Sequence, residues 1–126
     1  SDVLLDYVLS PFARLFSHEL NGIYSPPKQN QLEDLRGKIG VTDSRIINSL
    51  AERLKICEEI GLVKLENETP IRDREVEKRV EEVWCKKAEE LGIKDIYSIQ
   101  QLYRLVSAMS REVQERTITK KWNQSN

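Results

Sequence analysis

Side chains suited to covalent or acid–base catalysis are few in this sequence. His18 is the single histidine, and it lies in a mostly apolar stretch. Hydrolysis and acyl transfer need a nucleophile and a base held together by an orienting group, which one isolated histidine does not supply. Carboxylates occur in pairs at Glu58 and Glu59, Glu81 and Glu82, and Glu89 and Glu90. Each pair lies beside lysines or arginines, which is typical of a solvated helix face rather than of a catalytic site. The sequence therefore predicts a protein that is not an enzyme.

Metal and phosphate-loop sites are not predicted either. A structural zinc site uses four Cys or His ligands, whereas this chain offers Cys57, Cys85 and His18 without paired spacing. The five glycines are scattered, so they form no glycine-rich loop that would cradle a phosphate. Both thiols suit small buried positions instead.

The charge balance limits how the chain binds an anionic partner. With 20 basic and 21 acidic residues, its net charge is −1. A protein with this net charge does not bind nucleic acid through its overall charge. Any surface that binds nucleic acid must therefore be local.

The pattern of apolar residues predicts mainly helices. Helical spacing marks residues 2–20, 29–38, 44–60, 73–91 and 96–117, while residues 62–71 suit a small hairpin. The breaks are expected at Pro26 and Pro27 and at glycines 40, 61 and 92. We predict an all-α fold of about five helices with one small β-hairpin. Residues 1–126 are expected to form one helical domain, with a flexible basic tail at 118–126.

Length and composition place the chain among ordinary globular proteins. Its 126 residues are 39% hydrophobic and 33% charged, which suits one core. No apolar run approaches the roughly 20 residues of a membrane span, and charged residues interrupt the first 20 positions. The sequence predicts a cytoplasmic protein with no membrane partner.

One interpretation is a transcriptional regulator that reads duplex DNA. Residues 32–50, followed by residues 59–65, resemble a winged helix-turn-helix motif. The second helix of that motif enters the major groove, so the resemblance implies that Arg45, Asn48 and Ser49 face base edges. Lys64 would then contact phosphate from the wing.

A second resemblance covers residues 20–105 and gives the preferred interpretation. Tyr24 with Pro26 and Pro27 precedes a short helix, a helix opening with Arg45 and carrying Arg53, and Trp84 on the next helix. This order is similar to the C-terminal domain of the large subunit of archaeal and eukaryotic DNA primases. The family has an iron–sulfur cysteine directly after the proline pair, where this chain has Lys28. We therefore expect no iron–sulfur cluster and no other cofactor.

A chain of this family without the iron–sulfur cluster resembles the noncatalytic third subunit of some archaeal primases. This implies that the chain supports primer synthesis in DNA replication beside the catalytic and large primase subunits. Arg45 and Arg53, eight residues apart, would grip the initiating nucleoside triphosphate or the primer 5′ triphosphate. Single-stranded or primed DNA would be the template partner. The predicted binding residues are Arg45, Asn48, Arg53, Lys28 and Trp84.

Each of these residues also has a simpler interpretation. Arg45 and Arg53 suit a solvated helix face, and Lys28 suits the end of a loop. Trp84 shares a helical stripe with Val80 and Leu91, which favours a core position. A pure protein-interaction module is a third interpretation if the apolar stripe of residues 96–113 is partly exposed.

Overall fold

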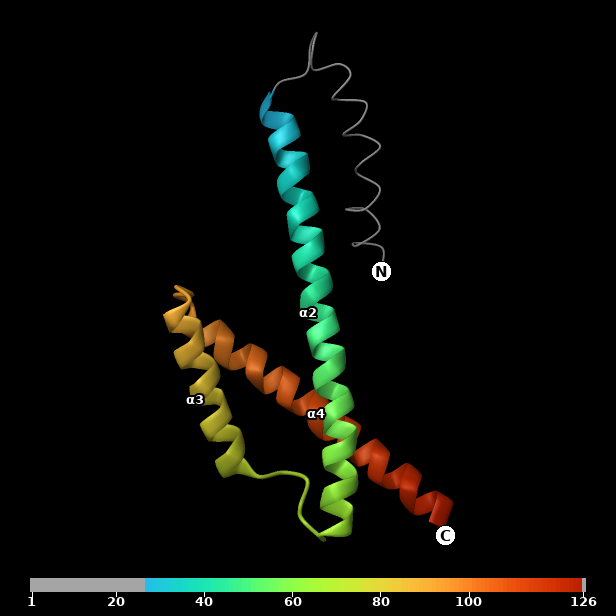
Figure 1. The fold of residues 1–126 in the computed structure, drawn as a ribbon. Helices are drawn as coiled ribbons and strands as arrows, with labels where there is room; N and C mark the ends of the chain where they lie inside the picture. The colour runs from blue at the N-terminus through green and yellow to red at the C-terminus, as the bar shows by residue number, and fades with distance from the viewer. Residues whose placement is uncertain (1–26, 126) are drawn as a thin grey trace. The chain divides into compact units, whose positions relative to one another are not determined.

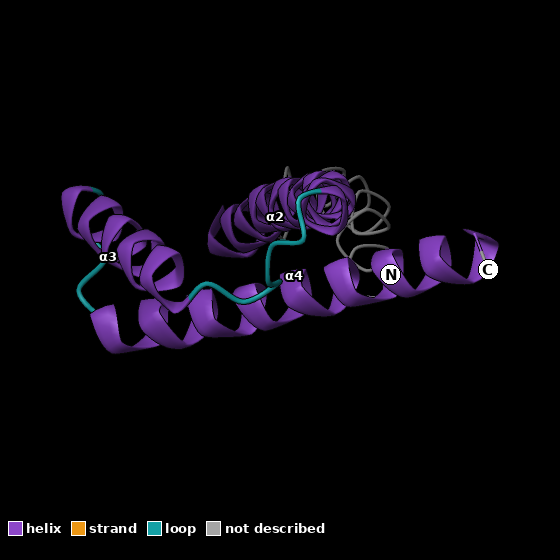
Figure 2. Ribbon diagram, turned by 90° about the horizontal axis from the view of Figure 1, so that it is seen from below, coloured by secondary structure: helices purple, strands orange, loops and turns teal. Residues whose placement is uncertain are grey.

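The computed structural model describes residues 27–125, which form three helices and no strand (Figures 1 and 2). They are α2 (Pro27–Glu66), α3 (Arg74–Glu90) and α4 (Ile96–Ser125). The all-α class is confirmed. The chain divides into two compact units, Ser1–Ala51 and Glu52–Asn126, with the boundary inside α2. The helix predicted at residues 2–20 and the segment from Tyr24 to Pro26 lie outside the described residues.

Helix α2 covers two of the predicted helices and the first half of the predicted hairpin. The expected break after Gly40 is wrong, because α2 continues through residues 41–44. Within this stretch the Thr42 hydroxyl donates a hydrogen bond of 2.9 Å to the Lys38 carbonyl one turn earlier. A hydroxyl satisfied in this way leaves the helical ladder intact. A glycine inside a helix costs only about 1 kcal/mol relative to alanine, which the rest of a long helix offsets.

The hairpin predicted at residues 62–71 is wrong, because residues 62–66 complete α2. The helix ends where Glu68 adopts a left-handed φ of 53°. The Thr69 amide then donates to the Lys64 carbonyl at 2.8 Å. Pro70 follows and has no amide hydrogen with which to continue the ladder. The apolar residues Leu62, Val63 and Leu65 were therefore helical rather than extended.

Helices α3 and α4 begin and end where local capping chemistry allows. The predicted helices at 73–91 and 96–117 are confirmed in these positions. Asp73 caps α3 by accepting a hydrogen bond of 3.1 Å from the Val76 amide. Gly92, at φ 84°, closes α3, and the Ile93 amide reaches back to Ala88. Asp95 caps α4 in the same way through Ser98.

Helix α4 continues to Ser125, so residues 118–125 are helical. The expected single domain and the flexibility of this basic segment stay predictions.

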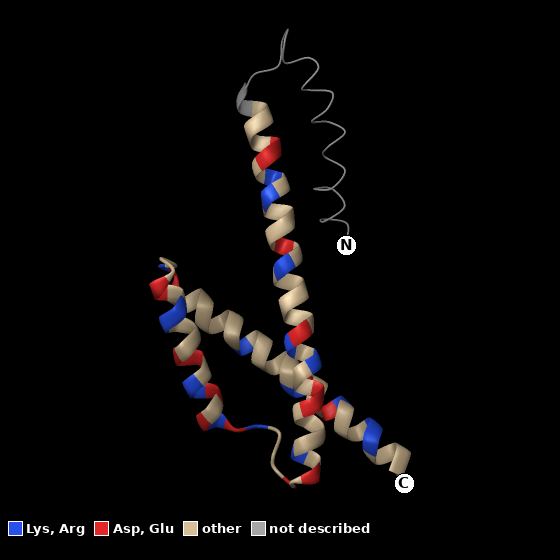
Figure 3. Cartoon of the chain, viewed as in Figure 1, with Lys and Arg blue, Asp and Glu red and all other residues tan. Residues whose placement is uncertain are grey.

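The second unit is built around the contact between α3 and α4. Its buried apolar residues are Cys57, Ala88, Tyr103 and Val106. The ring of Trp84 on α3 meets the ring of Tyr103 on α4 edge to face, with 5.1 Å between centroids. Figure 3 shows acidic and basic residues alternating along α3, whereas the first half of α4 carries few charges. The buried stripe of α4 therefore fixes how the two helices pack.

Gly61 of α2 lies close to the backbone of α4 at Gln114. A Cβ added there would lie 3.1 Å from the Gln114 Cα and 3.3 Å from its carbonyl oxygen. Because both atoms belong to the backbone, they cannot rotate away as a flexible side chain could. The glycine thus permits the crossing of the two helices inside the second unit.

A Gly61→Val substitution is expected to lower the free energy of unfolding by about 1–3 kcal/mol, as overpacking does in other cores. The branched side chain forces α4 away from α2 at Gln114. Chemical denaturation followed by circular dichroism measures the change. The matched control is Val63→Ala, which alters an exposed position of the same helix. Equal stability of Gly61→Val and the unmodified protein would contradict the close crossing.

Several large apolar side chains of the first unit are exposed. Their exposed fractions run from 46% to 63% at Leu32, Leu35, Ile39, Val41, Ile46 and Ile47. Of the two thiols that the sequence places at buried positions, Cys57 is buried and Cys85 is half-buried. Exposed apolar faces are typical of surfaces that contact another molecule. Exposure also extends to Leu102 and Leu105 in the stripe of residues 96–113.

None of the described helices has the length and apolar character that a membrane crossing requires. The cytoplasmic location stays a prediction.

Candidate functional site

A polar stripe is buried along one face of α4. Ser107, Ser110 and Gln114 are only 7%, 6% and 6% exposed. They continue the line of Tyr103 and Val106 at spacings of three and four residues, so the same helix face changes from apolar to polar. Burying polar groups is costly unless they have partners. This stripe is therefore the best candidate for a functional site in the second unit.

Arg53 of α2 reaches this stripe. Its Nη1 donates a hydrogen bond of 2.5 Å to the Ser110 hydroxyl, in a partly buried position. Its guanidinium also lies over the Trp84 ring, with 5.9 Å from Cζ to the ring centroid. Within residues 27–125 no carboxylate forms an ion pair with Arg53, so its charge is held by neutral partners. A guanidinium held in this way is ready to bind an anion.

Gln114 lies one turn beyond Ser110 and has an unsatisfied amide. Its Oε1 is buried and has no hydrogen-bond partner among the described residues. A side-chain amide can present either its acceptor or its two N–H donors, because rotation by 180° exchanges its ends. Orphaned buried polar groups are rare and call for a functional explanation. Gln114 is thus poised to bond a ligand beside Arg53 and Ser110.

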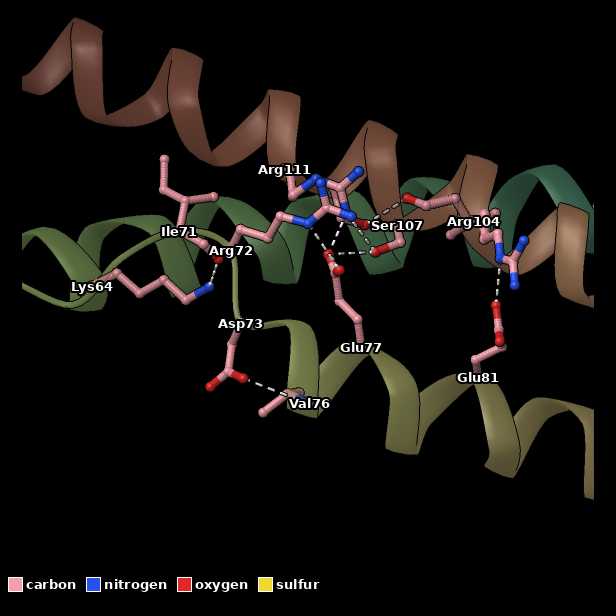
Figure 4. A network of polar contacts seen from close by, with 12 residues as sticks. Lys64, Ile71, Arg72, Asp73, Val76, Glu77, Glu81, Arg104, Ser107 and Arg111 are labelled. Carbon is pink, nitrogen blue, oxygen red and sulfur yellow. Dashed lines mark hydrogen bonds and ion pairs between the residues drawn. The ribbon is translucent and has the colours of Figure 1, made fainter.

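Glu77 of α3 anchors a second group of contacts on the same stripe (Figure 4). Its Oε1 accepts hydrogen bonds from the Arg111 guanidinium and, at 3.1 Å, from the Ser107 hydroxyl. Its Oε2 accepts one from Arg72 at 3.2 Å. Burial alone would raise the pKa of Glu77, but these donors and the charge of Arg111 outweigh it, so the pKa is lowered. The carboxylate is therefore ionised and held in one orientation.

Glu77→Gln is expected to lower the free energy of unfolding at neutral pH by about 1–3 kcal/mol, because it weakens charge-assisted hydrogen bonds. A lowered folded-state pKa contributes stability above the unfolded glutamate value of about 4.3, and that contribution is lost as pH falls through the folded-state pKa. The difference between variant and unmodified protein should thus shrink towards pH 3. Urea denaturation at pH 7 and pH 3 measures it. Glu82→Gln, at an exposed position of α3, is the control and should show no such pH dependence.

Lys64 supplies another cation on the α2 face that carries Arg53. Residues 53, 57, 60 and 64 follow helical spacing, so Arg53, the buried Cys57 and Lys64 lie along one side of the helix. The Lys64 ammonium donates to the Ile71 carbonyl in the loop after α2 (Figure 4). Lysine has two further donors, so this contact leaves the ammonium able to bind an anion.

The predicted site residues fall in different parts of the chain. Arg45 and Asn48 lie in α2 within the first unit, and both are exposed. Lys28 lies in the first turn of α2, and its side chain is outside the described residues. Arg53 and Trp84 lie in contact in the second unit. Of the five residues, the structure thus shows two in contact with each other.

Sequence reasoning missed Ser107, Ser110, Gln114, Glu77 and Arg111. A signal for the first three was present, because they continue the helical stripe of apolar residues in the last helix. A polar residue at an expected core position is a candidate for function. Glu77 and Arg111 gave no such signal, since each lies in a charge-rich stretch. Within the described residues, no group of three or more His, Cys, Asp or Glu side chains is placed to hold a metal ion.

Comparison with known proteins identifies a family other than the two that the sequence motifs resemble. The family model described as "Chorismate mutase type II" matches residues 35–115. A curated relative, the "Bifunctional chorismate mutase/prephenate dehydratase" of Buchnera aphidicola subsp. Schizaphis graminum (strain Sg), is 32% identical over 103 residues. That alignment covers 79% of this chain and 26% of the relative, so the chain spans about a quarter of the relative's length. No solved structure matches.

These findings overturn the functional predictions. The resemblance to the primase large-subunit domain is wrong, and so are the roles in DNA replication and the partners it implied: primase subunits, nucleoside triphosphate and DNA. The alternative of a DNA-binding transcriptional regulator is wrong as well. The matched family is one of enzymes, which contradicts the prediction of a protein without catalytic function. The nucleotide is no longer the expected ligand. Membership of a binding site stays a prediction for Arg45, Asn48, Arg53, Lys28 and Trp84.

Proposed function

The chain belongs to the chorismate mutase type II family, and from this premise we propose that it converts chorismate to prephenate. The proposed site is the polar stripe of α4 with the side chains that reach it from α2 and α3. The observation that carries the proposal is Arg53, a cation without a carboxylate partner in the described part of the chain, beside the buried and unsatisfied Gln114. The mutase step alone is proposed.

The chemistry of the substrate suits these side chains. Chorismate carries two carboxylates, a ring hydroxyl and an enol ether oxygen. Arg53 and Lys64 offer charged donors to a carboxylate, and Gln114 offers a neutral amide one turn beyond Ser110, which holds Arg53. Because the net charge of the chain is −1, attraction of a dianion must come from this local group of cations rather than from the whole molecule.

The reaction needs no nucleophile and no proton transfer. The ether C–O bond breaks while a C–C bond forms between the enolpyruvyl methylene carbon and the ring, all within one molecule. A protein accelerates such a rearrangement in two ways. It holds the two reacting ends in contact, and it stabilises the negative charge that develops on the ether oxygen.

The residues of the stripe divide these tasks in the proposal. The Arg53 guanidinium binds a substrate carboxylate and thereby holds the reacting ends together. The Gln114 amide donates an N–H to the ether oxygen, where charge develops, in a buried setting that strengthens the bond. Glu77 keeps one lone-pair direction after its three donors are counted, and it accepts the hydrogen of the ring hydroxyl.

The test is direct. Purified protein is mixed with chorismate, and the loss of the absorbance of its conjugated ring diene is followed with the appearance of prephenate. We expect turnover without added metal or cofactor. The rate must exceed that of the uncatalysed rearrangement measured in the same buffer. A rate equal to this background, with circular dichroism showing a helical protein, would overturn the proposal.

A further inference from the structure

Trp84 is placed against the cation on which the proposed function depends. The guanidinium of Arg53 lies 5.9 Å from the centroid of the Trp84 ring. The Trp84 ring is in turn held by Tyr103. The two rings meet edge to face, with 5.1 Å between centroids and an interplanar angle of 69°. Tyr103 is 4% exposed and belongs to the core. The position of Arg53 is thereby linked to the rigid α3–α4 contact.

This arrangement leaves the hydrogen-bonding edge of Arg53 available. A cation over an aromatic ring is attracted to the face of the ring, which uses none of its N–H donors. The guanidinium has five such donors, and Ser110 accepts from Nη1. The others remain for a bidentate contact with a carboxylate, the geometry that a guanidinium favours.

Holding the Arg53 guanidinium in place before the substrate binds favours substrate binding. A long arginine side chain loses rotational freedom when it binds a ligand, and that loss weakens binding. A ring and a hydroxyl that hold the guanidinium before the substrate arrives remove much of this cost. The benefit appears in substrate binding and in the alignment of the reacting ends.

We propose that Trp84 is a positioning residue, which holds the Arg53 guanidinium by its ring face for the carboxylate of the substrate. This inference rests on the proposed mutase function and deepens it. A merely structural Trp84 would instead act through the stability of the α3–α4 packing, independently of Arg53. The two roles differ in whether the effect of Trp84 requires the arginine.

A double-mutant cycle with Trp84→Leu and Arg53→Ala separates these roles. Trp84→Leu should lower kcat/KM about 3- to 30-fold, mainly through a higher KM, as loss of a cation–π contact implies. Trp84→Phe, which keeps an aromatic face and is the milder change for folding, should recover most of that loss. In the Arg53→Ala background, Trp84→Leu should change kcat/KM less than 2-fold, because the partner is gone. Val83→Ala, at an exposed position beside it, is the control.

Ligand binding gives a second readout that does not depend on turnover. The chain has two tryptophans, so Trp122→Phe leaves Trp84 as the only indole emitter. Titration with prephenate, the proposed product, should change its fluorescence to saturation, and Arg53→Ala should abolish the change. An equal loss of kcat/KM from Trp84→Leu in both backgrounds overturns the inference and leaves the mutase function standing. If Arg53→Ala retains full kcat/KM, the proposed site itself fails, and the inference with it.

Discussion

Arg53→Ala should lower kcat/KM for chorismate by about 10²-fold or more, because its contact with a substrate carboxylate holds the reacting ends together. The guanidinium bonds Ser110 at 2.5 Å and has no carboxylate partner in the described part of the chain. Its removal therefore breaks no ion pair of the fold there. Stopped or steady-state assays at several chorismate concentrations measure the effect. The free energy of unfolding should change far less than the activity does.

Two further variants make the Arg53 prediction specific. Lys55→Ala removes a cation two residues away, at an exposed position of α2, and should leave kcat/KM unchanged. Arg53→Lys keeps the charge but loses the planar fork, so it should recover only part of the activity. Equal losses for Arg53→Ala and Lys55→Ala would show that general charge, and not the held guanidinium, attracts the substrate.

Gln114→Leu should lower activity without lowering stability. The buried Oε1 has no partner within residues 27–125, so an apolar side chain of similar size removes an unsatisfied group from a position that is 6% exposed. We expect the free energy of unfolding to stay equal or to rise by about 1 kcal/mol. We also expect kcat to fall by about 10²-fold or more, because the donor to the ether oxygen is lost. Active sites often contain groups that lower the stability of the fold but are needed for activity.

Thermal denaturation and mutase assays on the same preparations test both halves. Gln101→Leu, at an exposed position of the same helix, serves as the control and should leave kcat unchanged. A Gln114→Leu protein that is clearly less stable would mean that the amide is satisfied and structural. A variant with full kcat would remove Gln114 from the reaction.

The predicted absence of catalysis failed for a chemical reason. That prediction assumed that catalysis needs a nucleophile with a base, which His18 alone does not supply. An intramolecular rearrangement uses neither group. Its demands are a few charged and neutral donors in a fixed arrangement, such as Arg53, which the Ser110 hydroxyl holds, and Gln114. Residue types common on every protein surface carry no signal of this kind by themselves.

Local chemistry predicted the second half of the fold well. The start of α3, its end and the start of α4 follow from Asp73, Gly92 and Asp95, whose contacts involve only neighbouring residues. The end of α4 at Ser125 lies beyond the predicted residue 117. Tyr103 and Val106, which lie in the helix predicted at 96–117, are buried in the core. The break at Gly61 and the hairpin after it were wrong, since a glycine can serve a close helix crossing as well as end a helix. The neighbour that decides between these uses, Gln114, is far away in sequence.

The sequence by itself determined the helical class, the caps of α3 and α4, and the local nature of any anion-binding surface, because each depends on composition or on residues a few positions apart. Only the tertiary structure decided which polar residues are buried and which cation they meet. Arg53 and Ser110 are 57 positions apart, and Glu77 and Arg111 are 34 apart. Contacts of that range depend on how whole helices pack, which no local pattern encodes. The site is therefore a property of the packed second unit.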